Sequence, residues 1–124
     1  IEEEHILDIT HHNFLPLDLR KLVGSARTVD GCFGRSHHED YPTLDSLLVP
    51  LHTYFTVVID YLRIDGRPEI GCVLASGSHR YMSFLTTMAK SVQWSTVLDY
   101  HVAYMDVRRQ EMKRNEYLGW GTID

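Results

Sequence analysis

The feature that most constrains this chain is a long apolar stripe that begins at Leu44. From there the large apolar residues recur at intervals of 3, 1, 3, 3, 1, 3, 1 and 3, which is the spacing of one face of an α-helix. Thr43 is a suitable N-cap, so we predict a helix over residues 43–63. Pro50 lies inside it, where a proline removes one backbone hydrogen bond and clashes with the preceding turn at a cost of about 3 kcal/mol. We therefore expect a kink or a break near Leu47.

A second long apolar stripe follows in the C-terminal half and predicts a helix over residues 95–114. Its members share one helical face: Trp94, Val97, Leu98, His101, Tyr104, Met105, Arg108 and Met112. Between the two stripes, Pro68 and Gly77 bound one short helix, because proline favours helix starts and glycine favours helix ends. Ser78 can then cap another helix that runs to Val92.

The first forty residues are the irregular part of the chain. Pro16 and Gly24 bracket one short helix, whereas "VDGCFGRSHHEDYP" has the composition of turns and loops. A chain of 124 residues is long enough for one core. We predict an all-α fold: a compact single-domain bundle of about five helices, in which an irregular region with one short helix, 1–42, joins a helical core, 43–124.

Charge and composition argue against several classes of partner. Twelve Lys and Arg against 17 Asp and Glu give a net charge of −5, the wrong sign for gripping a phosphate backbone. No apolar run approaches the roughly 20 residues that span a bilayer, so we expect no membrane partner. Cys32 and Cys72 are too few for a disulfide scaffold, which favours an intracellular location, in the cytoplasm or nucleus. Because the chain starts at Ile1, we expect a segment of a longer protein.

One stretch holds residues of the kind that bind zinc. "CFGRSHHED" contains the thiol of Cys32 and the imidazoles of His37 and His38, and His11 and His12 could supply further ligands. Structural zinc sites usually pair their ligands two to four residues apart in two knuckles, and this chain has no second knuckle. We interpret the stretch as a loop with solvated histidines and predict no metal site.

The candidates for catalysis have simpler structural explanations. Ser78 and His79 are neighbours, but adjacent residues on a helix do not face each other. His101 lies on an apolar face, where a lone histidine is usually a core residue whose ring binds the backbone or a tyrosine. No phosphate-binding glycine loop, HExxH motif or EF-hand spacing occurs. We predict that the chain is not an enzyme, with no catalytic residue and no cofactor.

Four stretches between residues 42 and 124 follow one another in a distinctive order: "PTLDSLLVPLHTYFTVV", "RYMSFL", "WSTVLDYHVAYMDVRRQEM" and "EYLGWGTID". Together they resemble the gag-like, capsid-type domain that lies upstream of the reverse transcriptase in fungal retrotransposons, particularly the DIRS-type, tyrosine-recombinase class. "ILDITHHNFLPLDLRKL" looks like the short region before that domain. The resemblance implies a helical structural protein that self-associates and has no catalytic residues. Its matching positions are Trp94, Tyr100, Arg108, Arg109 and Trp120.

Residues and resemblance together suggest a homodimer. Large or adaptable side chains surround a few arginines in the C-terminal half, which is the composition of an interface centre: Trp94, Tyr104, Met105, Arg108, Arg109, Met112, Tyr117 and Trp120. We expect these side chains to contact a second copy by two-fold pairing, the commonest arrangement of identical chains. One alternative is a helical adaptor that binds another protein or nucleic acid. A small hydrolase or zinc-binding domain is the other.

Overall fold

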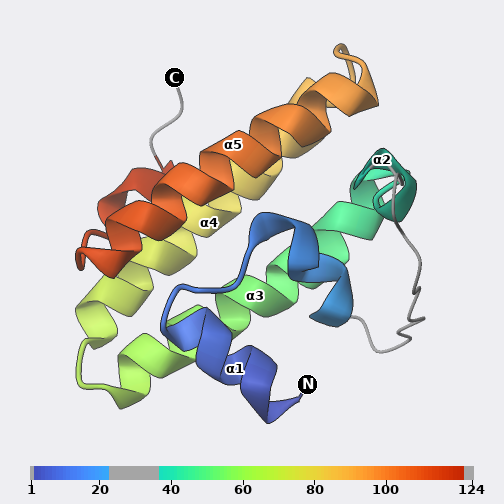
Figure 1. Cartoon of the computed structure of the whole chain (residues 1–124). Helices are drawn as coiled ribbons and strands as arrows, with labels where there is room; N and C mark the ends of the chain where they lie inside the picture. The colour runs from blue at the N-terminus through green and yellow to red at the C-terminus, as the bar shows by residue number, and fades with distance from the viewer. Residues whose placement is uncertain (1, 23–36, 122–124) are drawn as a thin grey trace.

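The protein is all-α, as the sequence predicts. A computed structural model describes residues 2–22 and 37–121, and this part of the chain contains helices and no strand (Figure 1). The elements are α1 (Glu3–Thr10), the 3₁₀-helix η1 (Pro16–Leu22), α2 (His37–Asp40), α3 (Leu44–Ile64), α4 (Pro68–Met88), α5 (Trp94–Lys113) and the 3₁₀-helix η2 (Leu118–Gly121).

Three long helices, α3, α4 and α5, form the body of the bundle, and each runs antiparallel to the one before it (Figure 1). α1 and η1 pack on α3, and η1 also contacts α5, so the N-terminal segment closes one side of the bundle. The short η2 folds back onto α4 and α5. The start of α5 is tied to the segment before α3, because the indole of Trp94 donates a 2.6 Å hydrogen bond to the carbonyl of Tyr41.

α3 has the boundaries that its apolar stripe predicts, but it does not break at Pro50. Thr43 caps the helix: its hydroxyl accepts from the backbone N–H of Ser46, whose own hydroxyl accepts from the N–H of Thr43. Pro50 is buried inside a continuous helix. Of the two expected outcomes, a kink or a break, the break is therefore wrong, because burial of the apolar face on both sides of Pro50 outweighs the loss of one hydrogen bond.

We expect Thr43→Ala to lower the free energy of unfolding by about 1 kcal/mol, because it removes both bonds of the capping box. Chemical denaturation measures this loss. Thr56→Ala is a matched control in the same helix: it removes an exposed hydroxyl that bonds only to the carbonyl of His52, and it should leave stability unchanged or slightly higher. Equal effects of the two variants would contradict the assigned cap.

α4 is one continuous helix, and the predicted boundary between Gly77 and Ser78 is wrong. Ser78 does not cap a helix; its hydroxyl donates to the carbonyl of Ala75 one turn earlier. The buried residues of α4 form one unbroken stripe with helical spacing: Gly71, Leu74, Gly77, Ser78, Tyr81 and Leu85. Burial of this stripe outweighs the roughly 1 kcal/mol that a glycine costs inside a helix.

The N-terminal region contains more helix than the sequence suggests. The short helix expected after Leu15 is η1, in 3₁₀ geometry, whereas α1 and α2 were not predicted. α1 ends like α3 and α5, with a left-handed residue that lets the next N–H bond back into the helix. That residue is Gly66 after α3 and Asn115 after α5, but His12 after α1, at φ 61°. A positive φ is uncommon for residues other than glycine, although histidine adopts it more often than most.

α3 is also the one helix, within residues 2–22 and 37–121, that is long and apolar enough to span a membrane by length and composition. This corrects the expectation that no segment approaches that threshold. Its most apolar face is buried in the bundle through Leu47, Pro50, Leu51, Tyr54, Phe55, Val58 and Leu62. Burial in the core accounts for part of the hydropathy of α3, whose Val49 and Ile64 remain exposed.

Candidate interaction surface

Most of the side chains expected at an interface lie in the chain's own core. Six of the eight are buried: Tyr104, Met105, Arg109, Met112, Tyr117 and Trp120. Trp94 and Arg108 are half-buried and bonded within the chain. The expectation of an exposed contact surface is wrong for these six side chains, because they pack inside the chain's own bundle.

Trp120 is the centre of this fold-back. Its ring is 1 % exposed and packs edge-on against Phe55, Tyr81 and Tyr104, with centroids 4.6, 5.4 and 5.8 Å away. Its indole N–H points at the sulfur of Met112, 3.4 Å away. Trp120 therefore joins residues of α3, α4 and α5.

Polar contacts hold the backbone of the same segment. The Tyr104 hydroxyl lies within hydrogen-bonding distance of the carbonyls of Gly119 and Trp120, at 2.8 and 3.0 Å. Arg108 also donates to the carbonyl of Gly119, at 2.9 Å, while it pairs with Glu111 and lies over the ring of Tyr104. A Cβ at Gly119 would lie only 3.0 Å from Cζ of Arg108, so a glycine permits this close approach.

His12 joins the N-terminal segment to the C-terminal one. Its Nε2 and the hydroxyl of Tyr117 share a buried hydrogen bond of 2.7 Å, and its carbonyl accepts from Arg109 at 3.0 Å. These contacts hold His12 in its left-handed conformation. Burial, followed by the positive charge of Arg67, lowers the pKa of His12 from 6.5 to about 4. His12, named from the sequence only as a possible further zinc ligand, is therefore a buried residue that joins two segments of the chain.

His101 is a core residue, as the sequence predicts. It is fully buried, and its Nδ1 lies 2.7 Å from the hydroxyl of Tyr81. Burial lowers the pKa of His101 from 6.5 to about 3 and raises that of Tyr81. The ring is neutral at physiological pH and has no access to a substrate in this conformation.

The other candidate groups do not assemble into a site among the described residues. Cys32 and the side chains of His37 and His38 lie outside the described part of the chain. His79 is exposed, and the Ser78 hydroxyl is bonded to its own helix. Glu2, Glu4 and His5 lie close enough to share an ion, but exposed acidic clusters of this kind are common without one.

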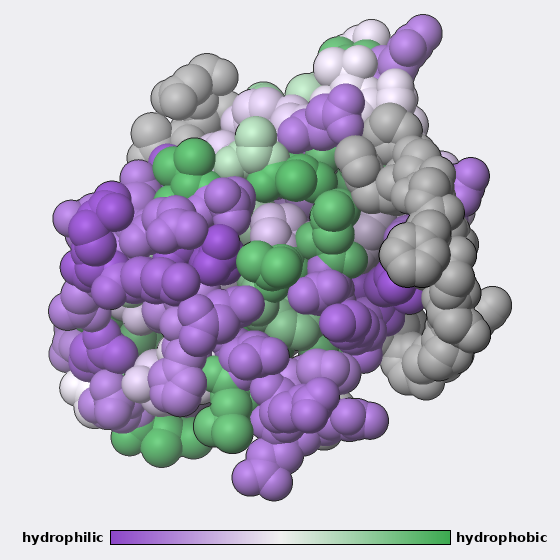
Figure 2. Space-filling view, in the orientation of Figure 1, coloured by the Kyte–Doolittle hydropathy of each residue, from purple (hydrophilic) through white to green (hydrophobic). Residues whose placement is uncertain are grey.

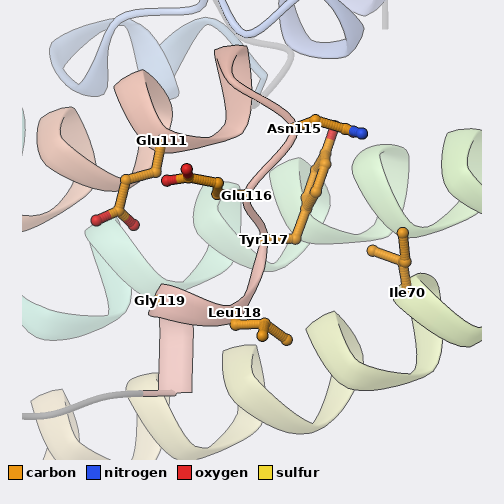
Figure 3. Close-up of a pocket in the computed structure, with 7 residues that line it drawn as sticks. All are labelled: Ile70, Glu111, Asn115, Glu116, Tyr117, Leu118 and Gly119. Atoms are coloured by element: carbon orange, nitrogen blue, oxygen red, sulfur yellow. The ribbon is translucent and has the colours of Figure 1, made fainter.

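An open hollow of about 620 Å³ lies where α5 ends and the chain turns into η2. It is lined by Ile70, Glu111, Asn115, Glu116, Tyr117, Leu118 and Gly119 (Figure 3). Figure 3 shows Leu118 and Ile70 on the side next to α4, and the carboxylates of Glu111 and Glu116 on the side of α5. Leu118 is 72 % exposed although its neighbour Tyr117 and nearby Trp120 are buried.

Leu118 and Ile70 were not predicted to line a surface site. Leu118 follows the last predicted helix, and Ile70 belongs to the buried side of the short helix expected there. The sequence did contain one indication. Leu118, a large apolar residue, lies between Tyr117 and Trp120, the two residues that anchor the segment. Only the fold-back shows that Leu118 is the one left outside.

The fold defines the class of protein, an all-α domain with a C-terminal segment locked onto its own bundle. Comparisons with protein-family models, with curated proteins and with solved structures find no match. The functional interpretation therefore rests on the residues and on this geometry.

Proposed function

We propose that this chain is a non-enzymatic structural domain that associates with copies of itself, as the resemblance to gag-like, capsid-type domains implies. The observation that carries the proposal is a contrast between two sets of side chains: polar groups that are bonded inside the chain, and apolar side chains that are exposed on its surface. Four of the side chains that could bind or react are bonded within the chain: His12, His101, Arg108 and Arg109. The surface offers apolar side chains instead.

Exposed apolar residues occur on several elements. Figure 2 shows apolar side chains gathered in the middle of the face where α5 and the N-terminal segment meet, with polar residues around them. Among the described residues, the large apolar side chains that remain exposed are Ile6, Leu7, Leu15, Leu17, Val49, Ile64, Val73, Val107 and Leu118. Gathered apolar surface of this kind marks sites of protein contact, whereas scattered single residues do not.

We expect sedimentation velocity between about 1 and about 100 micromolar, where interfaces of moderate affinity assemble, to show a concentration-dependent shift from one chain mass to two. Burial of apolar surface provides the driving force, so the dimer should persist at high salt. A single chain mass over the whole range would contradict self-association and favour the second candidate, a helical adaptor for another protein. The net charge of −5 argues against a nucleic-acid partner in either case.

A further inference from the structure

We propose that the hollow beside Leu118 is the two-fold contact between two copies, with Leu118 of each copy seated in the hollow of the other. This inference rests on the proposed self-association and names its surface. Leu118 projects from η2 while lining the hollow itself (Figure 3). The patch therefore carries both a protruding apolar side chain and an apolar recess. A two-fold axis brings the same patch of both subunits together, so each protrusion meets a recess.

Contacts within the chain, and not Leu118 itself, determine the shape of this patch. α5 ends at the left-handed Asn115, whose side-chain oxygen accepts a 2.6 Å hydrogen bond from Arg67 at the start of α4. Arg67 also lies over the ring of Tyr117, 5.6 Å from its centroid. Tyr117 in turn is bonded to His12. The walls are therefore formed before a partner arrives, which reduces the entropy lost on binding.

The charges around the hollow favour a second copy as its occupant. Glu111 and Glu116 line the recess, and Lys113 and Arg114 lie on the same turn of chain. Glu116 and Arg114 are each 62 % exposed and 3.8 Å apart, a loose pair at the surface. A patch that carries both signs is complementary to itself across a two-fold axis, whereas a purely acidic rim would select a basic partner. We infer that Glu116 of each copy faces Arg114 of the other.

The first test is Leu118→Glu in the full chain, followed by sedimentation over the same concentration range. Because a central apolar anchor is replaced by a buried charge, we expect the dimer to weaken by about thirtyfold or more. Val49→Glu is the matched control: Val49 is 58 % exposed in the first half of α3, away from the hollow, and its variant should dimerise like the parent. Circular dichroism checks that both variants keep the parent's helical signal.

The second test exchanges the charges. Glu116→Lys and Arg114→Glu should each weaken the dimer, and the double variant should restore it, because opposite charges then face each other again across the axis. A dimer that survives Leu118→Glu unchanged would overturn the hollow as the contact and leave self-association standing. A parent chain that stays monomeric would overturn both. Loss of the dimer in Val49→Glu but not in Leu118→Glu would assign the contact to the outer face of α3.

Discussion

Trp120→Ala should lower the free energy of unfolding by about 3–5 kcal/mol, the cost of truncating a large aromatic side chain in a well-packed core. Trp120 contacts residues of three helices, and its loss leaves a cavity between Phe55, Tyr81 and Tyr104. The sequence alone suggests a different result, in which this variant dissociates a dimer without unfolding it. Chemical denaturation followed by circular dichroism distinguishes the two.

Leu118→Ala is the matched control, because Leu118 lies two residues away in the same 3₁₀-helix and is 72 % exposed. Its effect on the free energy of unfolding of the single chain should stay within about 0.5 kcal/mol. The two variants lie in the same 3₁₀-helix, so a difference between their stabilities would result from the burial of Trp120 and not from its position in the chain. If the two variants have equal stability, the C-terminal segment is not docked on the bundle.

Periodicity predicted α3 and α5 well because each of them buries a single continuous face. α3 and α5 begin and end within about one residue of the predicted ranges. The two errors inside helices have a common cause. Pro50 and Gly77 have unfavourable local propensities, but each lies on a buried stripe whose packing outweighs a local cost of about 1 to 3 kcal/mol. Local rules fail where tertiary burial is largest.

The interaction surface could not be predicted in the same way. A face with Tyr104, Met105 and Met112 indicates burial, but helical spacing does not say whether the covering residue belongs to the same chain or to another. Here the covering residue is Trp120, which lies after α5 and outside its periodicity. The missing information was the direction of the chain after Asn115, where a left-handed residue turns it back toward α4.

The two buried histidines differ in whether local sequence periodicity could predict their burial. His101 lies on an apolar helical stripe, and of the two partners predicted for its ring, the backbone or a tyrosine, the structure shows Tyr81. His12 lies in a segment without periodicity, so nothing local indicated its burial. Its partner Tyr117 is 105 positions away in the sequence.

Acidification from pH 7.5 to pH 5 should destabilise the fold by about 4 kcal/mol through these two histidines together, about 2 kcal/mol each. Folding lowers their pKa values from 6.5 to about 4 for His12 and about 3 for His101. As the pH falls below 6.5, the unfolded chain binds two protons that the folded chain does not. The two histidines contribute fully to the free energy of unfolding above pH 6.5. Below that pH, the contribution of each histidine decreases by about 1.4 kcal/mol per pH unit. Urea denaturation at each pH measures it.

Single substitutions identify the source of this slope. His12→Asn suits the left-handed backbone, and His101→Gln keeps a polar side chain at the other site. Each variant should lower the free energy of unfolding at pH 7.5, because a buried hydrogen bond to Tyr117 or Tyr81 is lost. Each should also reduce the dependence of this free energy on pH by the contribution of one histidine. A free energy of unfolding that stays constant from pH 7.5 to pH 5 in the parent would mean that both rings are solvated in the folded chain, and the contacts that join the two ends of the protein would then be wrong.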